Sequence, residues 1–151
     1  SKLSGQLSAS FMESKILKTI AEPPATAAVG SSYVGKRLSN FANNAFTAQV
    51  KYQFTQAFSL GGTATYKSSV YTGQPDTAAD YDFILGVYRF RIPDYWLFDA
   101  FAEHKFSDKL IMRVNLKNIA NERYYLAGYR SGHFLYEGDE RRLTLTLTGK
   151  F

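Results

Sequence analysis

The stretch Arg141-Arg142-Leu143-Thr144-Leu145-Thr146-Leu147-Thr148-Gly149-Lys150-Phe151 alternates between polar and apolar residues from Arg142 onward and stops on an aromatic residue. Successive side chains of an extended strand point to opposite faces, so the leucines share one face and the threonines share the other. About nine to eleven tilted residues of this kind are enough to cross a bilayer, with one face against lipid and the other against water. The stretch therefore predicts a membrane-spanning β-strand.

Five further segments alternate with the same period of two, at residues 4–11, 46–54, 58–67, 96–106 and 110–117. Leu97 and Phe101 interrupt the pattern, because they are apolar residues on an otherwise polar side. Strands of this length that alternate in this way are typical of barrels that cross a membrane. We therefore predict an all-β fold, an antiparallel transmembrane β-barrel to which this chain contributes six strands.

The connections between these segments are alternately short and long. The sequence predicts tight turns at 55–57 and 107–108, and long links at 18–43, 71–94 and 119–140. All long links then lie at one end of the sheet, as in bacterial barrels, which have short periplasmic turns and longer outer loops. The aromatic residues at the opposite end are expected to form half of a girdle at the periplasmic rim: Phe54, Phe58, Phe106 and Phe151.

The composition agrees with a barrel wall. The 151 residues include 12 Phe, 11 Tyr and 1 Trp but no Cys, and the net charge is +5. No run approaches the 18 or so apolar residues of a transmembrane helix, so any crossing is by strands. The absence of Cys excludes disulfides and thiolate metal sites. The chain opens Ser1-Lys2-Leu3, and we interpret this as a processed or truncated end rather than a translation start.

Several motifs resemble those of one receptor family. The segment 114–125, Val-Asn-Leu-Lys-Asn-Ile-Ala-Asn-Glu-Arg-Tyr-Tyr, resembles the Asn-rich exit of the penultimate strand in TonB-dependent outer-membrane receptors, where side-chain amides would cap rim backbone groups. Segments 35–41, 93–100 and 129–134 are similar to further parts of that family, and most like its catecholate ferric-siderophore branch.

The resemblance implies that residues 1–151 are the C-terminal part of the β-barrel domain, the last six strands of a 22-stranded barrel, with the plug domain absent from this chain. It implies an active-transport receptor for ferric siderophores in the outer membrane of a Gram-negative bacterium. Such a receptor is energised by TonB and is not an enzyme. It needs no cofactor of its own, since the iron is carried within the siderophore. Lipid, lipopolysaccharide and the barrel-assembly machinery are further implied partners, and nucleic acid is not.

Aromatic rings and guanidinium groups together can stack on catechol rings and attract an anionic ferric complex. The long links combine these residue types, and the ligand-binding candidates are Tyr88, Arg89, Arg91, Tyr95, Trp96, Tyr124, Tyr125, Tyr129, Arg130 and His133. The last strand also resembles the C-terminal strand by which outer-membrane barrels are recognised for assembly, with Leu145, Leu147 and Phe151 as the signal.

Other interpretations stay open from sequence alone. A passive porin or an outer-membrane enzyme barrel would show the same strands, and a soluble all-β nucleic-acid-binding domain would suit the basic charge and the aromatics. Asp76, Asp80 and Asp82 could bind Ca²⁺ but lack EF-hand spacing. Ser131, His133 and Asp139 supply the residue types of a catalytic triad without a nucleophile elbow, which favours the assignment as a non-enzyme.

Overall fold

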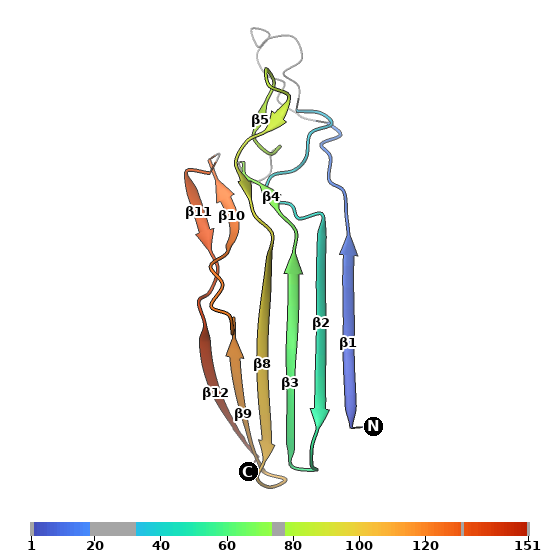
Figure 1. The fold of residues 1–151 in the computed structure, drawn as a ribbon, viewed down its shortest axis with the longest axis vertical. Coiled ribbons are helices and arrows are strands. Elements are labelled where there is room, and N and C mark those ends of the chain that lie inside the picture. The colour runs from blue at the N-terminus through green and yellow to red at the C-terminus, as the bar shows by residue number, and fades with distance from the viewer. Residues whose placement is uncertain (1, 19–32, 74–77, 131, 151) are drawn as a thin grey trace.

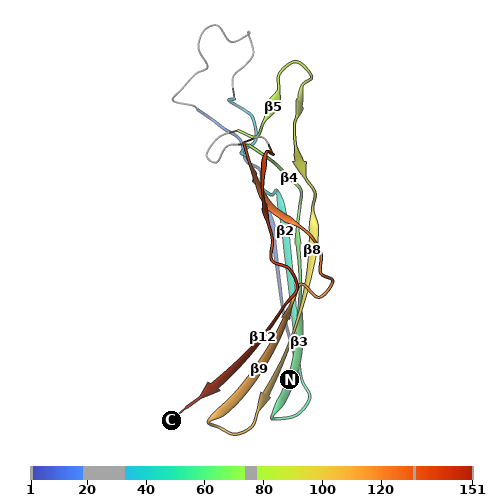
Figure 2. The same ribbon diagram turned by 90° about the vertical axis from the view of Figure 1, so that its left-hand side faces the viewer.

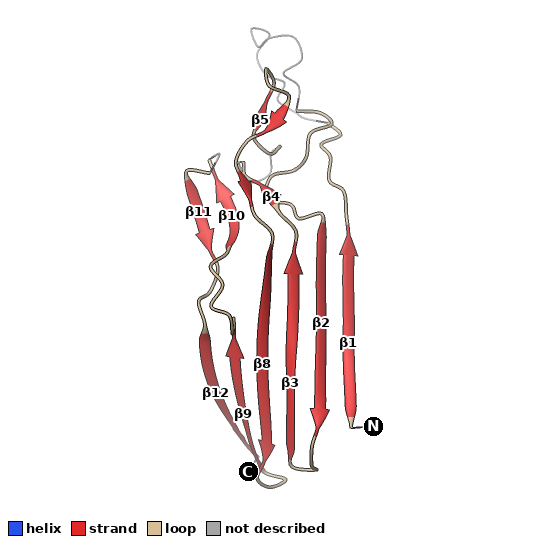
Figure 3. Cartoon of the chain, viewed as in Figure 1, coloured by secondary structure: helices blue, strands red, loops and turns tan. Residues whose placement is uncertain are grey.

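The computed structural model describes residues 2–18, 33–73, 78–130 and 132–150. In these ranges the chain forms strands, turns and loops (Figure 3). None of the described residues belongs to a helix long and apolar enough to cross a membrane.

Six long strands form one antiparallel sheet in the order β1, β2, β3, β8, β9, β12 (Figure 1). Their bounds are Leu3–Phe11 for β1, Asn44–Gln53 for β2, Phe58–Lys67 for β3, Tyr95–Lys105 for β8, Leu110–Lys117 for β9 and Arg142–Gly149 for β12. Each long strand corresponds to one of the six predicted segments, so the predicted all-β antiparallel fold is confirmed. The sheet is open, since β1 and β12 are its two edges.

Short strand pairs lie inside two of the long connections. They are β4 (Val70–Tyr71) with β7 (Arg91–Ile92), β5 (Tyr81–Asp82) with β6 (Val87–Tyr88), and β10 (Tyr125–Tyr129) with β11 (Phe134–Glu137). The sequence pattern does not predict them, because strands of two to five residues are too short to show a period. Figure 2 shows the sheet as a curved wall with these pairs above one end and the tight turns at the other.

The register aligns residues of one kind across the sheet. Phe46 of β2 faces Tyr66 of β3, which faces Trp96 of β8, so the apolar phases of three strands share one face. That face is exposed along much of its length: Leu7 is 79% and Leu143 is 69% accessible. An apolar face open to this extent needs a covering, and lipid provides one.

Two bands of aromatic rings cross the apolar face. Neighbouring ring centroids are 5.0–6.1 Å apart in the upper band, which consists of Phe11, Phe46, Tyr66, Trp96 and Phe98. They are 4.6–6.3 Å apart in the lower band, which lies near the tight turns and consists of Tyr52, Phe54, Phe58, His104 and Phe106.

The distance between the two aromatic bands is close to the height of the apolar band of an outer-membrane barrel. Phe58 and Tyr66 are eight residues apart on β3, which is about 27 Å along a strand and roughly 20 Å at a tilt of about 40°. Outer-membrane barrels carry aromatic girdles around an apolar band of about 25 Å. The predicted rim cluster is confirmed for Phe54, Phe58 and Phe106, whereas Phe151 lies outside the described residues.

Side-chain hydrogen bonds stabilise the turns and loops at both ends of the sheet. At one tight turn, the Thr55 hydroxyl accepts hydrogen bonds from the N–H groups of Ala57 (3.2 Å) and Phe58 (3.0 Å). At the other end, Asn118 is 3% exposed, and its amide accepts from the Glu122 N–H (2.8 Å) and donates to the Glu122 carbonyl (2.9 Å). The predicted capping of the rim by asparagine amides is therefore confirmed.

Candidate functional site

The long connections fold against one another at the end of the sheet opposite the tight turns (Figures 1 and 2). We call residues 12–18, 33–43, 68–73, 78–94 and 124–137 (without 131) the outer loop cluster. Four of the five buried apolar side chains among the described residues belong to it: Val70, Ala78, Ala79 and Ile92, each 5% exposed or less. The tightest packing of the described chain is therefore in the loops, which gives them fixed positions.

Hydrogen bonds join segment 33–43 to the loop segments on both sides of it. The Ile16 N–H donates to the Lys36 carbonyl at 2.9 Å, and the Ala79 N–H donates to the Arg37 carbonyl at 2.8 Å. The Arg37 N–H in turn donates to the Tyr88 hydroxyl at 2.8 Å. Segment 33–43 thus lies between its two neighbours and is bonded to both.

Asp82 organises the β5–β6 hairpin. Its Oδ1 accepts hydrogen bonds from the N–H groups of Ile84 and Leu85, both at 2.9 Å, and its Oδ2 accepts from the Arg89 Nε at 3.2 Å. Two hydrogen bonds hold the pKa of the Asp82 carboxyl below its ordinary value. The bond from the Leu85 N–H contributes most, and the bond from the Arg89 guanidinium comes second. Asp82, one of the three aspartates that could bind Ca²⁺, is in the structure a turn cap that is 8% exposed. Asp76 lies outside the described residues.

Aromatic rings of this hairpin pack on each other and on Tyr71. The ring of Tyr88 lies 4.9 Å from that of Tyr71 and 5.0 Å from that of Tyr81, centroid to centroid. The Lys36 ammonium lies 3.6 Å from the Tyr81 centroid, which is within the range of a cation–π interaction. The predicted ligand residues Tyr88 and Arg89 are therefore both engaged in contacts within the loop cluster.

A side-chain amide joins two loops that are distant in sequence. The Asn40 Nδ2 donates to the Gly128 carbonyl at 2.9 Å, and the Gly128 N–H donates to the Asn40 Oδ1 at 2.8 Å. The Asn40 N–H also donates to the Tyr71 carbonyl at 2.7 Å. Gly128 is buried against Thr72, since a Cβ on Gly128 would lie 2.3 Å from the Thr72 Cγ2. We call the paired bonds between Asn40 and Gly128 the amide clamp, and it holds the β10–β11 hairpin against the other loops.

The tip of the β10–β11 hairpin carries three of the predicted ligand residues. The Arg130 guanidinium lies 5.7 Å from the Tyr129 ring centroid, and His133 Nδ1 lies 2.5 Å from the Arg130 carbonyl. Gly132 packs on Phe90, the residue before Arg91. A Cβ added to Gly132 would lie 3.3 Å from the Phe90 Cβ. Arg91 and the hairpin tip therefore lie on adjoining segments.

Half of the arginines have no carboxylate partner in the part of the chain that the structure describes. Among the described residues, Arg89, Arg113, Arg123 and Arg142 each form an ion pair, whereas no carboxylate lies within ion-pair distance of Arg37, Arg91, Arg130 or Arg141. Ser131, between Arg130 and His133, lies outside the described residues.

The remaining predicted ligand residues lie elsewhere. Tyr95 and Tyr124 pack together with centroids 4.6 Å apart, and Tyr125 begins β10 opposite Glu137. Trp96 belongs to the upper aromatic band on the apolar face and is 48% exposed there. The structure therefore brings Tyr129, Arg130 and His133 together at the hairpin tip, with Arg91 on the adjoining segment, and places Trp96 on the apolar face.

The assembly-signal leucines lie on the apolar face of β12. Leu145 faces Val114 and Leu147 faces Met112 across to β9, and the leucines are 60% and 63% exposed. Their role in assembly stays a prediction.

Two residues of the loop cluster were missed by sequence reasoning. Asn40 has a positive φ of 56°, which asparagine tolerates better than most residues, but nothing local to Ser39-Asn40 indicates a partner 88 residues away. Lys36 lies in segment 35–41, but its contact with Tyr81 depends on the fold of a different loop, which the sequence of that segment does not show.

Known proteins share this architecture. The family model described as TonB dependent receptor-like, beta-barrel, matches residues 6–119. The chain is similar to the "Probable TonB-dependent receptor BfrD" of Bordetella pertussis, with 32% identity over 113 residues, which are 74% of this chain and 14% of that protein. It is also similar to the "Probable TonB-dependent siderophore receptor PiuA" of Acinetobacter baumannii, with 24% identity over 80% of this chain and 14% of that protein. The chain thus spans about a seventh of the length of these relatives.

The chain also superposes on solved structures of receptors. The crystal structure of the siderophore receptor PiuA from Acinetobacter baumannii superposes with a TM-score of 0.75 at 20% identity, over 99% of this chain and 20% of that one, which shows the fold. The closed form of the ferric-catecholate import receptor Fiu from Escherichia coli K12 superposes with a TM-score of 0.63 at 25% identity, over 78% of this chain and 16% of that one.

Proposed function

Since this chain belongs to the TonB-dependent receptors, whose β-barrel matches its residues 6–119, we propose that it supplies wall strands and outer loops to a receptor that imports a ferric siderophore of the catecholate class. The family resides in the outer membrane of Gram-negative bacteria, so the apolar face of the sheet meets lipid and the polar face lines the barrel interior. This location rules out the soluble nucleic-acid-binding alternative.

The observation that carries the proposal is the position of Arg91 and Arg130 on adjoining segments of the outer loop cluster, where neither forms an ion pair with a carboxylate of the described residues. A ferric catecholate complex is a multiply charged anion with aromatic rings. Arg91 and Arg130 offer guanidinium groups to the charge, and Tyr129 offers a ring beside Arg130. His133 lies at the same hairpin tip. Tyr88, Arg89, Tyr95, Tyr124 and Tyr125 then act by supporting the loops rather than by touching the ligand first.

The relatives support the same substrate class. One is described as a siderophore receptor and another as a ferric-catecholate import receptor. Both are transport receptors rather than enzymes, which suits a role in binding and transport. In this proposal TonB energises import, the barrel-assembly machinery inserts the protein, and lipopolysaccharide surrounds the outer rim. A passive porin is the second candidate, and it would need no specific ligand.

Equilibrium binding to the assembled full-length receptor tests the proposal. Ferric catecholate, ferric hydroxamate and ferric citrate complexes are titrated against the unaltered protein and against Arg91→Ala, Tyr129→Ala and Arg130→Ala. Each arginine substitution is expected to weaken catecholate binding by about 1.5–3 kcal/mol, since hydrogen bonds to charged groups are worth roughly that much, and Tyr129→Ala, which removes a ring contact, by less. Lys67→Ala, on the polar face of β3, is the matched control and should change affinity less.

Two results would contradict the proposal. Unchanged affinity for every ferric catecholate complex in the triple variant, with surface abundance matched, would exclude the catecholate assignment and leave the barrel intact. Failure of the unaltered receptor to bind any ferric complex would favour the porin.

A further inference from the structure

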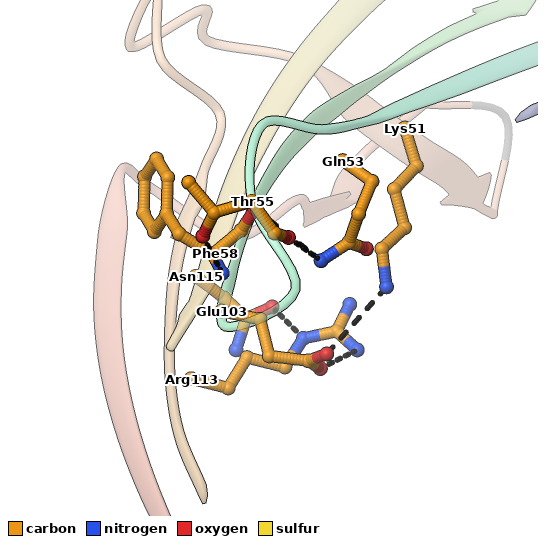
Figure 4. A network of polar contacts seen from close by, with 7 residues as sticks. All are labelled: Lys51, Gln53, Thr55, Phe58, Glu103, Arg113 and Asn115. Atoms are coloured by element: carbon orange, nitrogen blue, oxygen red, sulfur yellow. Dashed lines mark hydrogen bonds and ion pairs between the residues drawn. The ribbon is translucent and has the colours of Figure 1, made fainter. Parts of the chain in front are cut away.

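The polar face of the sheet contains a hollow near the tight-turn end. Its volume is about 180 Å³, and its lining includes Ser4, Gln6, Gln49, Lys51, Phe101 and Arg113. All of these residues belong to the long strands, so the hollow is separate from the outer loop cluster. Figure 4 shows Lys51 and Arg113 both directed at Glu103.

A glycine on β3 and an aromatic ring on β8 build one side of the hollow. Gly61 faces both Lys51 and Phe101 in register. A Cβ at Gly61 would lie 2.4 Å from the Phe101 ring, so the ring occupies the space above the glycine and is 8% exposed. The Arg113 guanidinium lies 4.5 Å from the centroid of the same ring. This contact holds the cation in place on a buried surface. It also explains why Phe101 interrupts the polar phase of its strand.

Two cations share one carboxylate at the hollow. Lys51 Nζ lies 3.5 Å from Glu103 Oε1, and Arg113 Nη1 lies 3.9 Å from Glu103 Oε2 (Figure 4). Both distances are at the long end for an ion pair, and the Arg113 Nε donates to Asn115 at 3.0 Å. An ammonium carries three donors and a guanidinium five, so donors remain for a second acceptor. The three charged groups together carry one net positive charge.

We propose that the hollow binds one carboxylate-sized anionic group between Lys51 and Arg113. This deepens the proposed function, because the polar face is the interior of the receptor barrel. Pockets for whole small molecules usually measure about 300–1,000 Å³. A hollow of about 180 Å³ therefore accepts one anionic group and excludes a complete ferric chelate. The group is either the side chain of an Asp or Glu on polypeptide lying inside the barrel, or a free anion.

Lysine chemistry on the assembled full-length receptor tests the proposal and separates the two sources. In the first arm, the acetylation rate of Lys51 in the unaltered receptor is followed by mass spectrometry, with and without inorganic phosphate. Lys67, on the same face at the other end of the sheet, is the internal control. In the second arm, a carbodiimide joins Lys51 to any carboxylate in contact, in the unaltered receptor and in Glu103→Gln, where the resident carboxylate is gone.

A free-anion site predicts that saturating phosphate slows Lys51 acetylation about tenfold, that Lys67 is unaffected, and that Arg113→Ala abolishes the protection. A side-chain source predicts a crosslink from Lys51 to an Asp or Glu outside residues 1–151, stronger in Glu103→Gln. The proposal is overturned if phosphate leaves Lys51 unprotected and Lys51 crosslinks to nothing except Glu103. No siderophore enters either arm, so failure here is distinguishable from failure of ferric-complex binding.

Discussion

Removal of the amide clamp should loosen the outer loop cluster while leaving the sheet unchanged. Asn40→Ala deletes both hydrogen bonds to Gly128, and it places alanine at a backbone position with a φ of 56°. Asn40→Gly deletes the same bonds but tolerates that φ. The two variants therefore separate the contribution of the clamp from that of the backbone conformation.

The magnitude follows from these two contributions. Each hydrogen bond is worth about 1 kcal/mol net, so the clamp contributes about 2 kcal/mol in Asn40→Gly. A left-handed conformation costs alanine about 1–2 kcal/mol more, which brings Asn40→Ala to about 3–4 kcal/mol. Because 1.4 kcal/mol is a factor of ten, local opening around Gly128 should become about 30-fold more frequent in the glycine variant and several hundredfold more frequent in the alanine variant.

Hydrogen exchange measures this opening directly. The assembled full-length receptor is exchanged in a lipid bilayer, and the peptide that contains Gly128 is followed by mass spectrometry. A peptide from the middle of β8 serves as the control, since it should exchange equally in all three proteins. If the Gly128 peptide exchanges at the same rate in both variants as in the parent, the clamp does not hold the hairpin and the reasoning is refuted.

Three further predictions concern the wall and the β5–β6 hairpin. Gly61→Ala should lower the free energy of unfolding by about 1–3 kcal/mol in denaturant titration, because its Cβ would displace the Phe101 ring, and a change below 0.5 kcal/mol would contradict that packing. The folded pKa of Asp82 is lowered, so the stability it gives the hairpin is complete above about pH 3.9 and is lost as pH falls through the lower folded pKa. Exchange across the hairpin should accelerate below that pH in the parent and show no such step in Asp82→Asn. Ala100→Arg, midway between the aromatic bands, should cost about 2–4 kcal/mol in lipid, whereas Leu97→Arg on the polar face should cost much less; equal costs would mean that the faces are misassigned.

The sheet could be predicted because its signal is periodic. Each long strand repeats polar and apolar residues often enough to fix its limits and its faces, and the lengths of the links fix which end carries the loops. Phe101 interrupts the alternation of β8 because its ring packs over Gly61 of the neighbouring strand β3. The sequence of β8 alone does not show this contact.

The loop cluster could be predicted only as a set of residue types. Sequence reasoning selected Arg89 and Arg91 as equals, because both are arginines in one long link. The structure distinguishes them, since Arg89 binds the buried Asp82 whereas Arg91 has no carboxylate partner among the described residues. Trp96 is a ligand candidate from its residue type, but the alternation of segment 96–106 also predicts that it lies on the apolar face, and the structure confirms that face. The difference between Arg89 and Arg91 depends on a contact with another strand that no local pattern records.

The amide clamp also bears on when the receptor becomes able to recognise a ligand. Asn40 precedes β2 and Gly128 follows β9, so four strands of the sheet lie between the two partners. Joining them before those strands pair would require closing a loop of nearly ninety flexible residues, whereas a completed sheet already holds them together. We therefore expect the loop cluster to form late in barrel assembly, after the strands between the two partners have paired. A defect in the pairing of β8 with β9 would then delay the appearance of binding sites at the cell surface without altering the affinity of the sites that do form.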